Sequence, residues 1–325
     1  MIALSLNDGI LASKLRDEGI ETHVISEVDN SFVGTFFKAF RLLKRRKIDI
    51  IHSHRYKENL LGFLLAKAVG VKKLITTMHG LSEPPLASTY ERNANKPVGF
   101  KTKIDYYMLN NHFTRVVAVS QEMKNTLIQK YGFKEEKVEV IYNGIPIPFA
   151  QRSMPSAPCS VPSSFHIGTV GRMVPVKDFD LFLEIAEEII KQKNSKFEIR
   201  NSNLENIHFS ILGDGPLKDK LTQKAKDLKI DNYVEFISPM PDPMPYYQSL
   251  DLYLNTSVHE GIPLSILEAM ACSKPVVAPK VGGIPEIISD GENGVLIETR
   301  EPKKIADFCL KLMQDKSMRS AIGDK

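Results

Sequence analysis

NTSVHEGIPLSILEAMACSKPVVAPKVGGIPEIISDGENG, residues 255–294, is the stretch from which the fold of this chain can be worked out. Pro263 lies where a helix should begin, because its ring presets a helical backbone angle and its missing N–H is one that a first turn does not use. We therefore predict a helix over residues 263–272. Ile262 precedes it, so no Ser, Thr, Asp or Asn caps the first amides. The amides left uncapped are those of Leu264, Ser265 and Ile266. Together with the positive end of the helix dipole, they predict an anion site.

Two glutamates in the same stretch are candidate ligand contacts. Glu268 shares a helix face with Ser265 on an otherwise apolar helix, so its carboxylate needs donors, which sugar hydroxyls supply without a second buried charge. Glu260 precedes the helix beside Gly261, where the backbone can approach a ligand closely. Taken singly, Glu260 is as simply interpreted as a solvated loop acid, and Glu268 as a rim residue of an amphipathic helix.

The string EGIPLSILEAMACSKPVVA, which contains both glutamates, resembles the E-x7-E region of the GT4-type (group 1) glycosyltransferases, which have the two-domain GT-B fold. The resemblance implies that Glu268 binds the nucleotide ribose, and that Glu260 and the backbone of Gly261 and Ile262 hold the transferred sugar. Ile262 replaces a frequent aromatic of the family, and Pro263 removes one backbone donor, so the sugar stays undefined.

The donor implied by this resemblance is a nucleotide-diphosphate sugar, with a UDP-sugar favoured and no further cofactor. Its phosphates would meet the amides of Leu264 and Ser265 at the start of the predicted helix. Gly282 and Gly283 follow the next predicted strand, and their bare backbone is a further candidate phosphate cradle.

Composition bounds the class of protein. A chain of 325 residues with 42% hydrophobic content is long enough for two domains, each with its own core. No run of about 18 apolar residues occurs, and the start MIALSLNDG lacks the features of a secretory signal. The cysteines Cys159, Cys272 and Cys309 are odd in number and widely spaced, which favours reduced thiols in the cytosol and excludes metal fingers. We therefore expect a cytoplasmic protein.

Charge is uneven along the chain. Residues 1–150 carry 22 Lys and Arg against 15 Asp and Glu, whereas residues 151–325 carry 21 against 24. The densest basic segment is FFKAFRLLKRRK, residues 36–47, in which apolar residues recur at helical spacing. One interpretation is a helix on an anionic membrane surface, which would make the protein peripheral on the inner face of the cell membrane. The other is a helix that packs its apolar stripe on a sheet; nucleic acid is not expected, because no binding motif is found.

Strand and helix patterns alternate along the chain, which is typical of parallel sheets with crossover helices. Residues 1–145 are expected to form an acceptor-side domain, and residues 165–325 a nucleotide-sugar domain. Residues 146–164 are rich in Pro and Ser and mark a linker. The predicted strands are 2–6, 21–26, 48–53, 73–78, 115–119 and 137–141, then 165–170, 207–212, 233–237, 275–278 and 295–297. The fold class is α/β, with two doubly wound Rossmann-like domains facing across a cleft and ligands outside the carboxyl ends of the strands.

Histidines follow two predicted strands of the N-terminal domain. His52 and His54 in IIHSH share a strand face, but no nearby Cys, Asp or Glu completes a metal site. His79 in TMHG stands at a strand end, where a lone histidine is usually structural. TMHG also resembles the family's N-domain histidine near the transferred sugar, which implies that His79 positions donor hydroxyls or the reacting geometry. Ser120 matches a further family position, for which a helix N-cap is the simplest account.

The strand expected at 165–170 is followed by GRMVPVKDFD. Gly171, Arg172 and Lys177 are the expected phosphate-binding residues of this loop, because two cations at a strand's carboxyl end can meet a diphosphate. Equivalent Arg and Lys residues do so in the family; without that context they are two exposed cations. Asp178 and Asp180 form the Asp-x-Asp of metal-dependent transferases of another fold. A helix N-cap and the helix dipole explain both acids, so no metal site is expected.

These features predict a metal-independent retaining glycosyltransferase that acts on a saccharide or lipid-linked acceptor in surface polysaccharide or glycolipid synthesis. The alternatives are a nucleotide-sugar epimerase of the same fold and a non-catalytic nucleotide-sugar-binding subunit. Family members open with a strand and a glycine-rich turn and end with a helix that returns to the N-domain. Neither pattern is found, so we expect a fragment that binds nucleotide but transfers sugar poorly.

Overall fold

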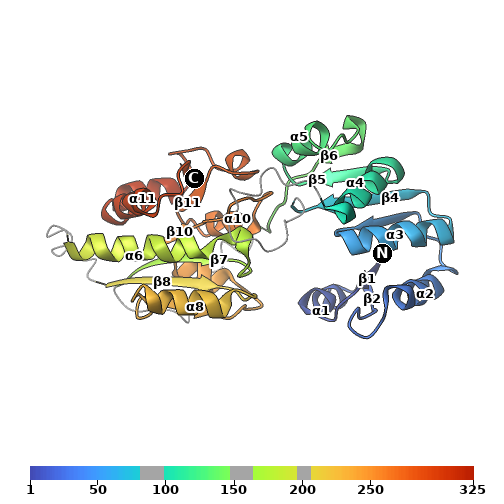
Figure 1. The fold of residues 1–325 in the computed structure, drawn as a ribbon, viewed down its shortest axis with the longest axis horizontal. Coiled ribbons are helices and arrows are strands. Elements are labelled where there is room, and N and C mark those ends of the chain that lie inside the picture. Colours follow the sequence, from blue (N-terminus) through green and yellow to red (C-terminus); the bar gives the residue numbers. More distant parts are fainter. Residues whose placement is uncertain (81–98, 147–163, 196–205) are drawn as a thin grey trace. The chain divides into compact units, whose positions relative to one another are not determined.

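The computed structural model describes residues 1–80, 99–146, 164–195 and 206–325. The chain divides into two compact units, one built mainly from residues before Tyr142 and the other from Tyr142 to Lys325. The residues expected to form a linker, 146–164, fall almost entirely outside the described ranges. Each unit combines parallel strands with helices (Figure 1), so the α/β class predicted from the alternating patterns is confirmed.

The N-terminal unit contains two parallel sheets. One pairs β1 with β2, and the other has the strand order β3-β4-β5-β6. The strands are β1 (Ile2–Ser5), β2 (Glu21–Val24), β3 (Ile50–Ser53), β4 (Lys73–Met78), β5 (Arg115–Ala118) and β6 (Val138–Val140). The helices between them are α1 (Ile10–Asp17), α2 (Phe32–Leu43), α3 (Tyr56–Val69), α4 (Phe100–His112) and α5 (Gln121–Gln129), with a 3-10 turn at Glu135–Lys137.

A small apolar core lies under both sheets of this unit. Its buried members are Ile25, Ala39, Leu61 and Leu65. Leu4 of β1 and Ile51 of β3 pack against this core from their separate sheets. Within the described residues β1 pairs with β2 alone and β3 with β4 alone, so each is an edge strand with one side of its backbone unpaired.

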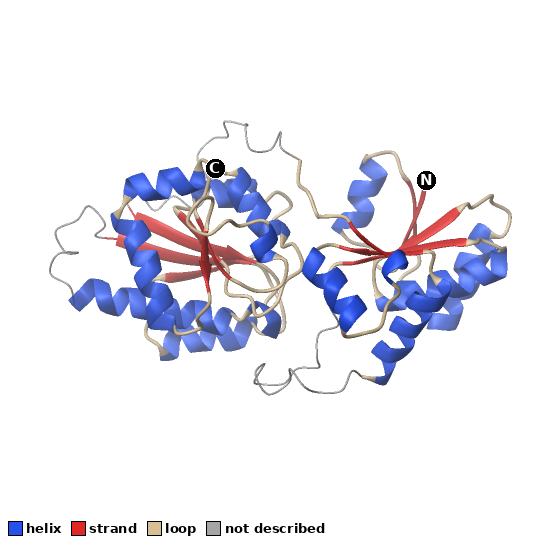
Figure 2. Cartoon of the chain, turned by 90° about the horizontal axis from the view of Figure 1, so that it is seen from above, coloured by secondary structure: helices blue, strands red, loops and turns tan. Residues whose placement is uncertain are grey.

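The C-terminal unit has one parallel six-stranded sheet in the order β12-β11-β10-β7-β8-β9. Its strands are β7 (Ser164–Val170), β8 (Asn206–Leu212), β9 (Val234–Ile237), β10 (Leu252–Leu254), β11 (Val276–Pro279) and β12 (Val295–Ile297). Its helices are α6 (Phe179–Ser195), α8 (Lys218–Asp227), α9 (Met244–Ser249), α10 (Leu264–Ala271), α11 (Pro302–Gln314) and α12 (Lys316–Gly323), with 3-10 turns at Pro175–Lys177 and Ile284–Glu286. Helices cover both faces of the sheet (Figure 2), and two separate apolar clusters fill the unit.

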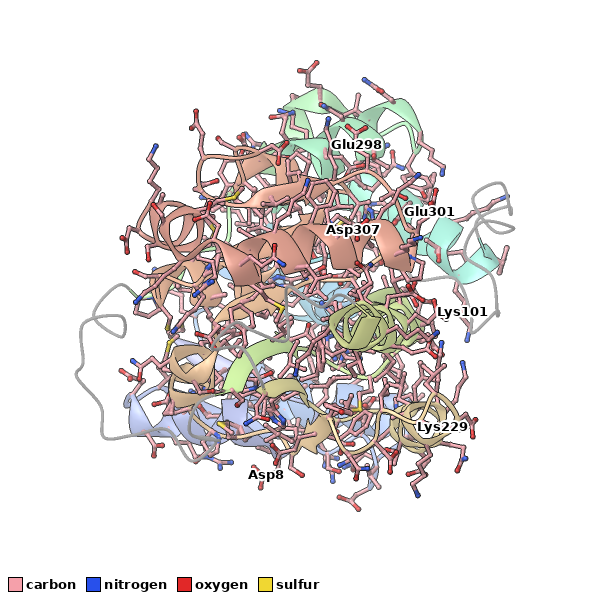
Figure 3. All side chains as sticks on the ribbon, turned by 90° about the vertical axis from the view of Figure 1, so that its left-hand side faces the viewer. Asp8, Lys101, Lys229, Glu298, Glu301 and Asp307 are labelled. Atoms are coloured by element: carbon pink, nitrogen blue, oxygen red, sulfur yellow. The ribbon has the colours of Figure 1, made fainter. Side chains whose placement is uncertain are left out.

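One face of this sheet is covered by α6 and α11, which contribute to the same apolar cluster. A polar contact also joins them, since Gln192 Nε2 donates to Asp307 Oδ1 at 2.9 Å. Asp307 is labelled on α11 in Figure 3. α11, near the C-terminal end of the unit, therefore packs onto α6, the first helix of the unit, on one face of the sheet.

The strand order reverses between β7 and β10. From β7 the chain proceeds outward to β8 and β9, and from β10 it proceeds to β11 and β12 on the other side. Such a switch point opens a crevice at the carboxyl ends of the two central strands, and this is where doubly wound sheets bind ligands. The loops that follow β7 and β10 are residues 171–178 and 255–263, which contain most of the expected site residues.

Most predicted elements are found within a few residues of their expected bounds, including the helix expected at 263–272, which is α10. Three elements have no predicted counterpart: α9, β10 and α12. β10 is three residues long, too short to display a strand's period of two, yet it occupies the centre of the sheet. No helix within the described ranges is long and apolar enough to cross a membrane.

Candidate functional site

An ion pair links the loop after β7 to the loop after β10 in the C-terminal unit. Lys177 Nζ lies 2.5 Å from Glu260 Oε1, and the two side chains are only 19% and 13% exposed. Ser257 Oγ donates to the same carboxylate oxygen at 2.6 Å. Thr256 Oγ1 donates to Lys177 O at 3.0 Å, so a hydrogen bond from a side chain of one loop to the backbone of the other also joins the two loops. The structure thus brings together two expected site residues from distant parts of the chain.

The start of α10 lacks a side-chain cap, as expected. Pro263 occupies the N-cap position, and the amides of Leu264 and Ser265 have no acceptor among the described residues. Ile266 N, however, donates to Pro263 O at 3.1 Å. The expectation of three available amides is therefore wrong for Ile266. The first turn of α10 contains a hydrogen bond between residues three apart, as in a 3-10 helix, and this bond uses the Ile266 amide. Two amides and the helix dipole remain available to an anion.

Glu268 is half-buried on α10 and has a donor within the protein. Tyr247 of α9 donates its hydroxyl to Glu268 Oε2 at 2.7 Å. Burial raises the pKa of Glu268, and the hydrogen bond from Tyr247 opposes that rise. Tyr247 thus satisfies one of the carboxylate oxygens, and the expectation that sugar hydroxyls also bind this carboxylate stays a prediction. The sequence carries no signal for this contact, because α9 was not predicted.

Gly282 and Gly283 support the loop of Glu260, and a phosphate cradle at this pair stays a prediction. Gly283 N donates to Glu260 O at 3.2 Å, which occupies one of the amides that a cradle would use. A Cβ at Gly282 would lie 1.9 Å from Glu260 O, and a Cβ at Gly283 would lie 2.5 Å from Gly261 O. Only glycine lets the two backbones approach this closely. This contact fixes Gly261 and Ile262, both of which are buried.

The three expected phosphate-binding residues of the loop after β7 differ in their contacts and in their exposure to solvent. A Cβ at Gly171 would lie 3.4 Å from Lys177 Cε, so Gly171 lies against the Lys177 side chain. Gly171 O also lies close to Gly213, which follows β8. A Cβ at Gly213 would lie 1.9 Å from Gly171 O. Arg172 is exposed, whereas Lys177 is held on Glu260. The two cations therefore share a loop but differ in how far they are exposed to solvent.

The Asp-x-Asp pair has structural partners of its own. Asp178 Oδ1 accepts a hydrogen bond from Leu181 N at 3.4 Å, and Asp180 in the first turn of α6 pairs with Lys220 and Lys224. Within the described ranges no group of three or more His, Cys, Asp or Glu side chains is arranged to hold a metal ion. Among the cysteines, Cys272 and Cys309 are free thiols, and Cys159 falls outside the described residues.

Three histidines from two strand ends lie in a row in the N-terminal unit. His54 Nδ1 is 3.1 Å from His79 Nε2, and His52 Nε2 is 2.9 Å from Thr77 Oγ1. The ring centroids of His52 and His54 are 4.5 Å apart, and those of His54 and His79 are 5.4 Å apart. Burial lowers the pKa of each imidazole, so the row is neutral at pH 7. His79 belongs to the N-terminal unit and Glu260 to the C-terminal unit.

Ser120 acts as the helix cap expected from its position. Its Oγ accepts a hydrogen bond from Met123 N at 3.1 Å.

The basic segment 36–47 has a packed side and an exposed side. Phe36, Phe40 and Leu43 pack against the core of the N-terminal unit, as the non-membrane interpretation requires. Phe37 is 53% exposed and Val33, one turn earlier, is 61% exposed. The surrounding exposed basic residues are Lys38, Arg41, Lys44, Arg45, Arg46 and Lys47. One of them, Arg46, pairs with Glu21 at 2.7 Å. Part of the apolar surface of this helix is therefore available to a partner.

Models of known families match both halves of the chain. Residues 164–315 match the family described as Glycosyl transferases group 1, and residues 28–147 match Glycosyltransferase Family 4. This chain is a family 4 glycosyltransferase. The resemblance inferred from the E-x7-E string is confirmed, and the two parallel-sheet units are those of a GT-B fold.

Individual relatives of this glycosyltransferase are distant. It is 26% identical over 313 residues to the D-inositol 3-phosphate glycosyltransferase of Kribbella flavida, which covers 94% of this chain and 72% of the relative. It is 25% identical to the UDP-Gal:alpha-D-GlcNAc-diphosphoundecaprenol alpha-1,3-galactosyltransferase of Escherichia coli, with 85% and 69% covered. The crystal structure of Anabaena Alr3699/HepE in complex with UDP and glucose superposes with a TM-score of 0.80 at 21% identity, over 99% of this chain and 84% of that one. The structural similarity is evidence for the fold.

Proposed function

We propose that this glycosyltransferase transfers a sugar from a UDP-sugar to a saccharide or lipid-linked saccharide acceptor, with retention of the anomeric configuration. The observation that carries the proposal is the Lys177–Glu260 ion pair beside the two uncapped amides of α10. It combines a cation, a carboxylate and helix-end donors at the switch point of the sheet, where nucleotides bind in doubly wound folds. The UDP in the Anabaena complex supports the choice of base.

Lys177 is the proposed principal contact of the diphosphate. An ammonium has three donors, and Glu260 uses one of them, so two are left for phosphate oxygens. Arg172 adds an exposed cation in the same loop, and the amides of Leu264 and Ser265 add neutral donors. These groups stabilise the negative charge that develops on the leaving diphosphate, which is the role of a divalent ion in other transferases. We therefore propose that the reaction does not depend on a metal.

We propose that Glu268 and Glu260 bind different sugars of the donor, the ribose and the transferred sugar. Glu268 keeps acceptor capacity beyond its bond with Tyr247, which suits the adjacent hydroxyls of a ribose. Glu260 Oε1 is occupied by Lys177 and Ser257, so an attack by this oxygen on the sugar would break both contacts. We assign Glu260 to the hydroxyls of the transferred sugar, together with the backbone of Gly261 and Ile262, and not to the role of a nucleophile.

In the proposed transfer, the bond between C1 of the sugar and the β-phosphate oxygen breaks, and its electron pair leaves with UDP. The acceptor oxygen bonds to C1 on the same face, and its proton passes to the departing phosphate oxygen, so no protein base is needed. His79 is proposed to position a sugar hydroxyl, because its neutral imidazole, paired with His54, is suited to hydrogen bonding. The C-terminal unit is thus proposed as the donor domain and the N-terminal unit as the acceptor domain.

The proposed acceptor is anionic or lies at an anionic membrane. The names of the Kribbella and Escherichia relatives include an inositol phosphate and a lipid-linked diphosphate. The N-terminal half of this chain is basic, and α2 exposes Val33 and Phe37 beside basic side chains. An exposed apolar pair rimmed by cations is the arrangement by which amphipathic helices bind anionic lipid surfaces.

Calorimetry with UDP, GDP and ADP, followed by a transfer assay, tests this function. UDP-glucose, UDP-galactose and UDP-N-acetylglucosamine would be offered with soluble saccharides and with polyprenyl-diphosphate-linked saccharides, and proton NMR would determine the anomeric configuration of the product. We expect UDP binding, acceptor-dependent UDP release and a retained configuration. An inverted product, or the absence of binding to all three nucleotides, would refute the proposal. Conversion of the donor sugar without an acceptor would identify an epimerase.

A further inference from the structure

Arg300 joins the two loops that form the donor site. It lies in the loop between β12 and α11 and is 34% exposed. Its Nη2 donates to Asp178 Oδ2 at 2.6 Å and to Thr256 O at 2.8 Å, and its Nη1 donates to Ser257 O at 3.3 Å. A single guanidinium from a third loop therefore holds both the loop after β7 and the loop after β10.

These contacts fall next to both members of the central ion pair. Asp178 directly follows Lys177, and the two carbonyls belong to the segment that leads into Glu260. The same segment bonds back to the other loop, since Val258 N donates to Val176 O at 2.8 Å. Arg300 thus contacts the chain neighbours of Lys177 and Glu260 through these three hydrogen bonds.

The backbone at Asp178 gives Arg300 a specific task. Asp178 has φ 45° and ψ 53°, the left-handed region that residues with a side chain adopt rarely. One of its carboxylate oxygens caps α6 and the other receives Arg300, so the side chain is held from two directions. If this residue relaxed to a common backbone conformation, the chain direction at Lys177 would change with it.

We propose that Arg300 is a positioning residue for donor binding: it keeps the loop of Lys177 and the loop of Glu260 at the spacing that the diphosphate and the sugar require. This inference rests on the proposed function. Arginine is required because its planar fork reaches three acceptors at once, whereas the ammonium of lysine is a point charge on a flexible stem.

The first test compares Arg300→Ala and Arg300→Lys with the parent in calorimetric titrations with UDP, and melting temperatures are measured in parallel. Both variants should bind UDP at least about tenfold more weakly, the effect of losing one hydrogen bond to a charged group. Lys304→Ala is the matched control. It removes a cation of the same charge from the first turn of α11, where Lys304 pairs with the exposed Glu301 labelled in Figure 3. This control should bind like the parent.

The second test separates positioning from general stability. Asp178→Gly removes the backbone strain, because glycine adopts φ 45° freely. In that background Arg300→Ala should cost less than about threefold in UDP affinity, so the two substitutions should be non-additive. Equal losses in both backgrounds, with a lowered melting temperature, would show that Arg300 only stabilises the fold, and would overturn the proposal. Parent-like binding by Arg300→Ala or Arg300→Lys would overturn it as well.

A readout without nucleotide keeps this inference separate from the proposed function. The NMR signal of 13C-methylated Lys177, assigned through Lys177→Arg, should move to the position of exposed lysines in Arg300→Ala and stay in place in Lys304→Ala. An unchanged signal would overturn the role of Arg300, even if the parent bound UDP. A parent that binds none of the nucleotides would refute the donor assignment, while this signal would still decide whether Arg300 positions Lys177.

Discussion

Replacing Lys177 by alanine should weaken UDP binding more than replacing Arg172 does. Loss of a charge-assisted hydrogen bond to phosphate costs about 1.5–3 kcal/mol, which is the expected effect of Arg172→Ala. In Lys177→Ala the Glu260 carboxylate also remains, 13% exposed and without its cation, beside the diphosphate. Two like charges about 6 Å apart repel by roughly 3 kcal/mol at an effective dielectric constant of about 20. The expected loss for Lys177→Ala is therefore about 4–6 kcal/mol.

A double variant distinguishes the two contributions. Glu260→Gln keeps the size of the side chain and an oxygen that accepts from Ser257, but it removes the charge. The Lys177→Ala, Glu260→Gln combination should regain about 3 kcal/mol relative to Lys177→Ala alone. The measurement is calorimetry with UDP at two salt concentrations, since a part of the loss that arises from repulsion decreases as salt screens it.

Two results would refute this reasoning. Equal losses for Lys177→Ala and Arg172→Ala would show that the buried ion pair plays no special part. A double variant no better than Lys177→Ala would show that the Glu260 carboxylate does not face the diphosphate.

Further predictions concern ribose recognition, acid stability, lipid binding and local opening. Glu268→Gln should weaken UDP binding about tenfold and leave inorganic diphosphate unaffected, because only the ribose contact is weakened; equal losses in calorimetry would move Glu268 off the ribose. Burial lowers the pKa of His166 to about 4, so as pH falls below about 6.5 the unfolded chain binds a proton that the folded chain does not, and stability, complete above that pH, falls by about 3 kcal/mol toward pH 4. Urea unfolding at stepped pH measures this, and the same dependence in the non-titrating His166→Gln would contradict it. Phe37→Ser should lower cosedimentation with anionic vesicles about tenfold, and undiminished binding would favour the packed-helix interpretation. Hydrogen exchange should be faster across residues 2–24 than across β7 and β8, because β1 and β2 form an isolated pair over a small core; equal protection would count against this.

The local elements of this chain could be predicted from its sequence because their causes are local. Proline at a helix start and the alternation of apolar runs act within a few residues, so the helix expected at 263–272 is observed at Leu264–Ala271. The strand expected at 73–78 is observed with these bounds, Lys73–Met78. The E-x7-E string is likewise contiguous, and it was sufficient to indicate the family.

Partners across the site could not be predicted, because a residue pattern indicates which face of an element is buried and not what covers that face. Lys177 meets Glu260, Tyr247 meets Glu268, and Arg300 meets Asp178, in each case from a different loop or helix. These pairings depend on the order of the strands, which brings the ends of β7 and β10 side by side.

Glycines illustrate the same limit at the level of the backbone. The Gly282-Gly283 pair is equally compatible with a phosphate cradle and with close packing, since both need a backbone free of Cβ atoms. In the fold, Gly283 N donates to Glu260 O and the two backbones are in contact. This backbone contact depends on β10, whose loop carries Glu260. β10 is only three residues long, and its place at the centre of the sheet comes from long-range hydrogen bonding with β7 and β11, not from a periodicity of its own sequence.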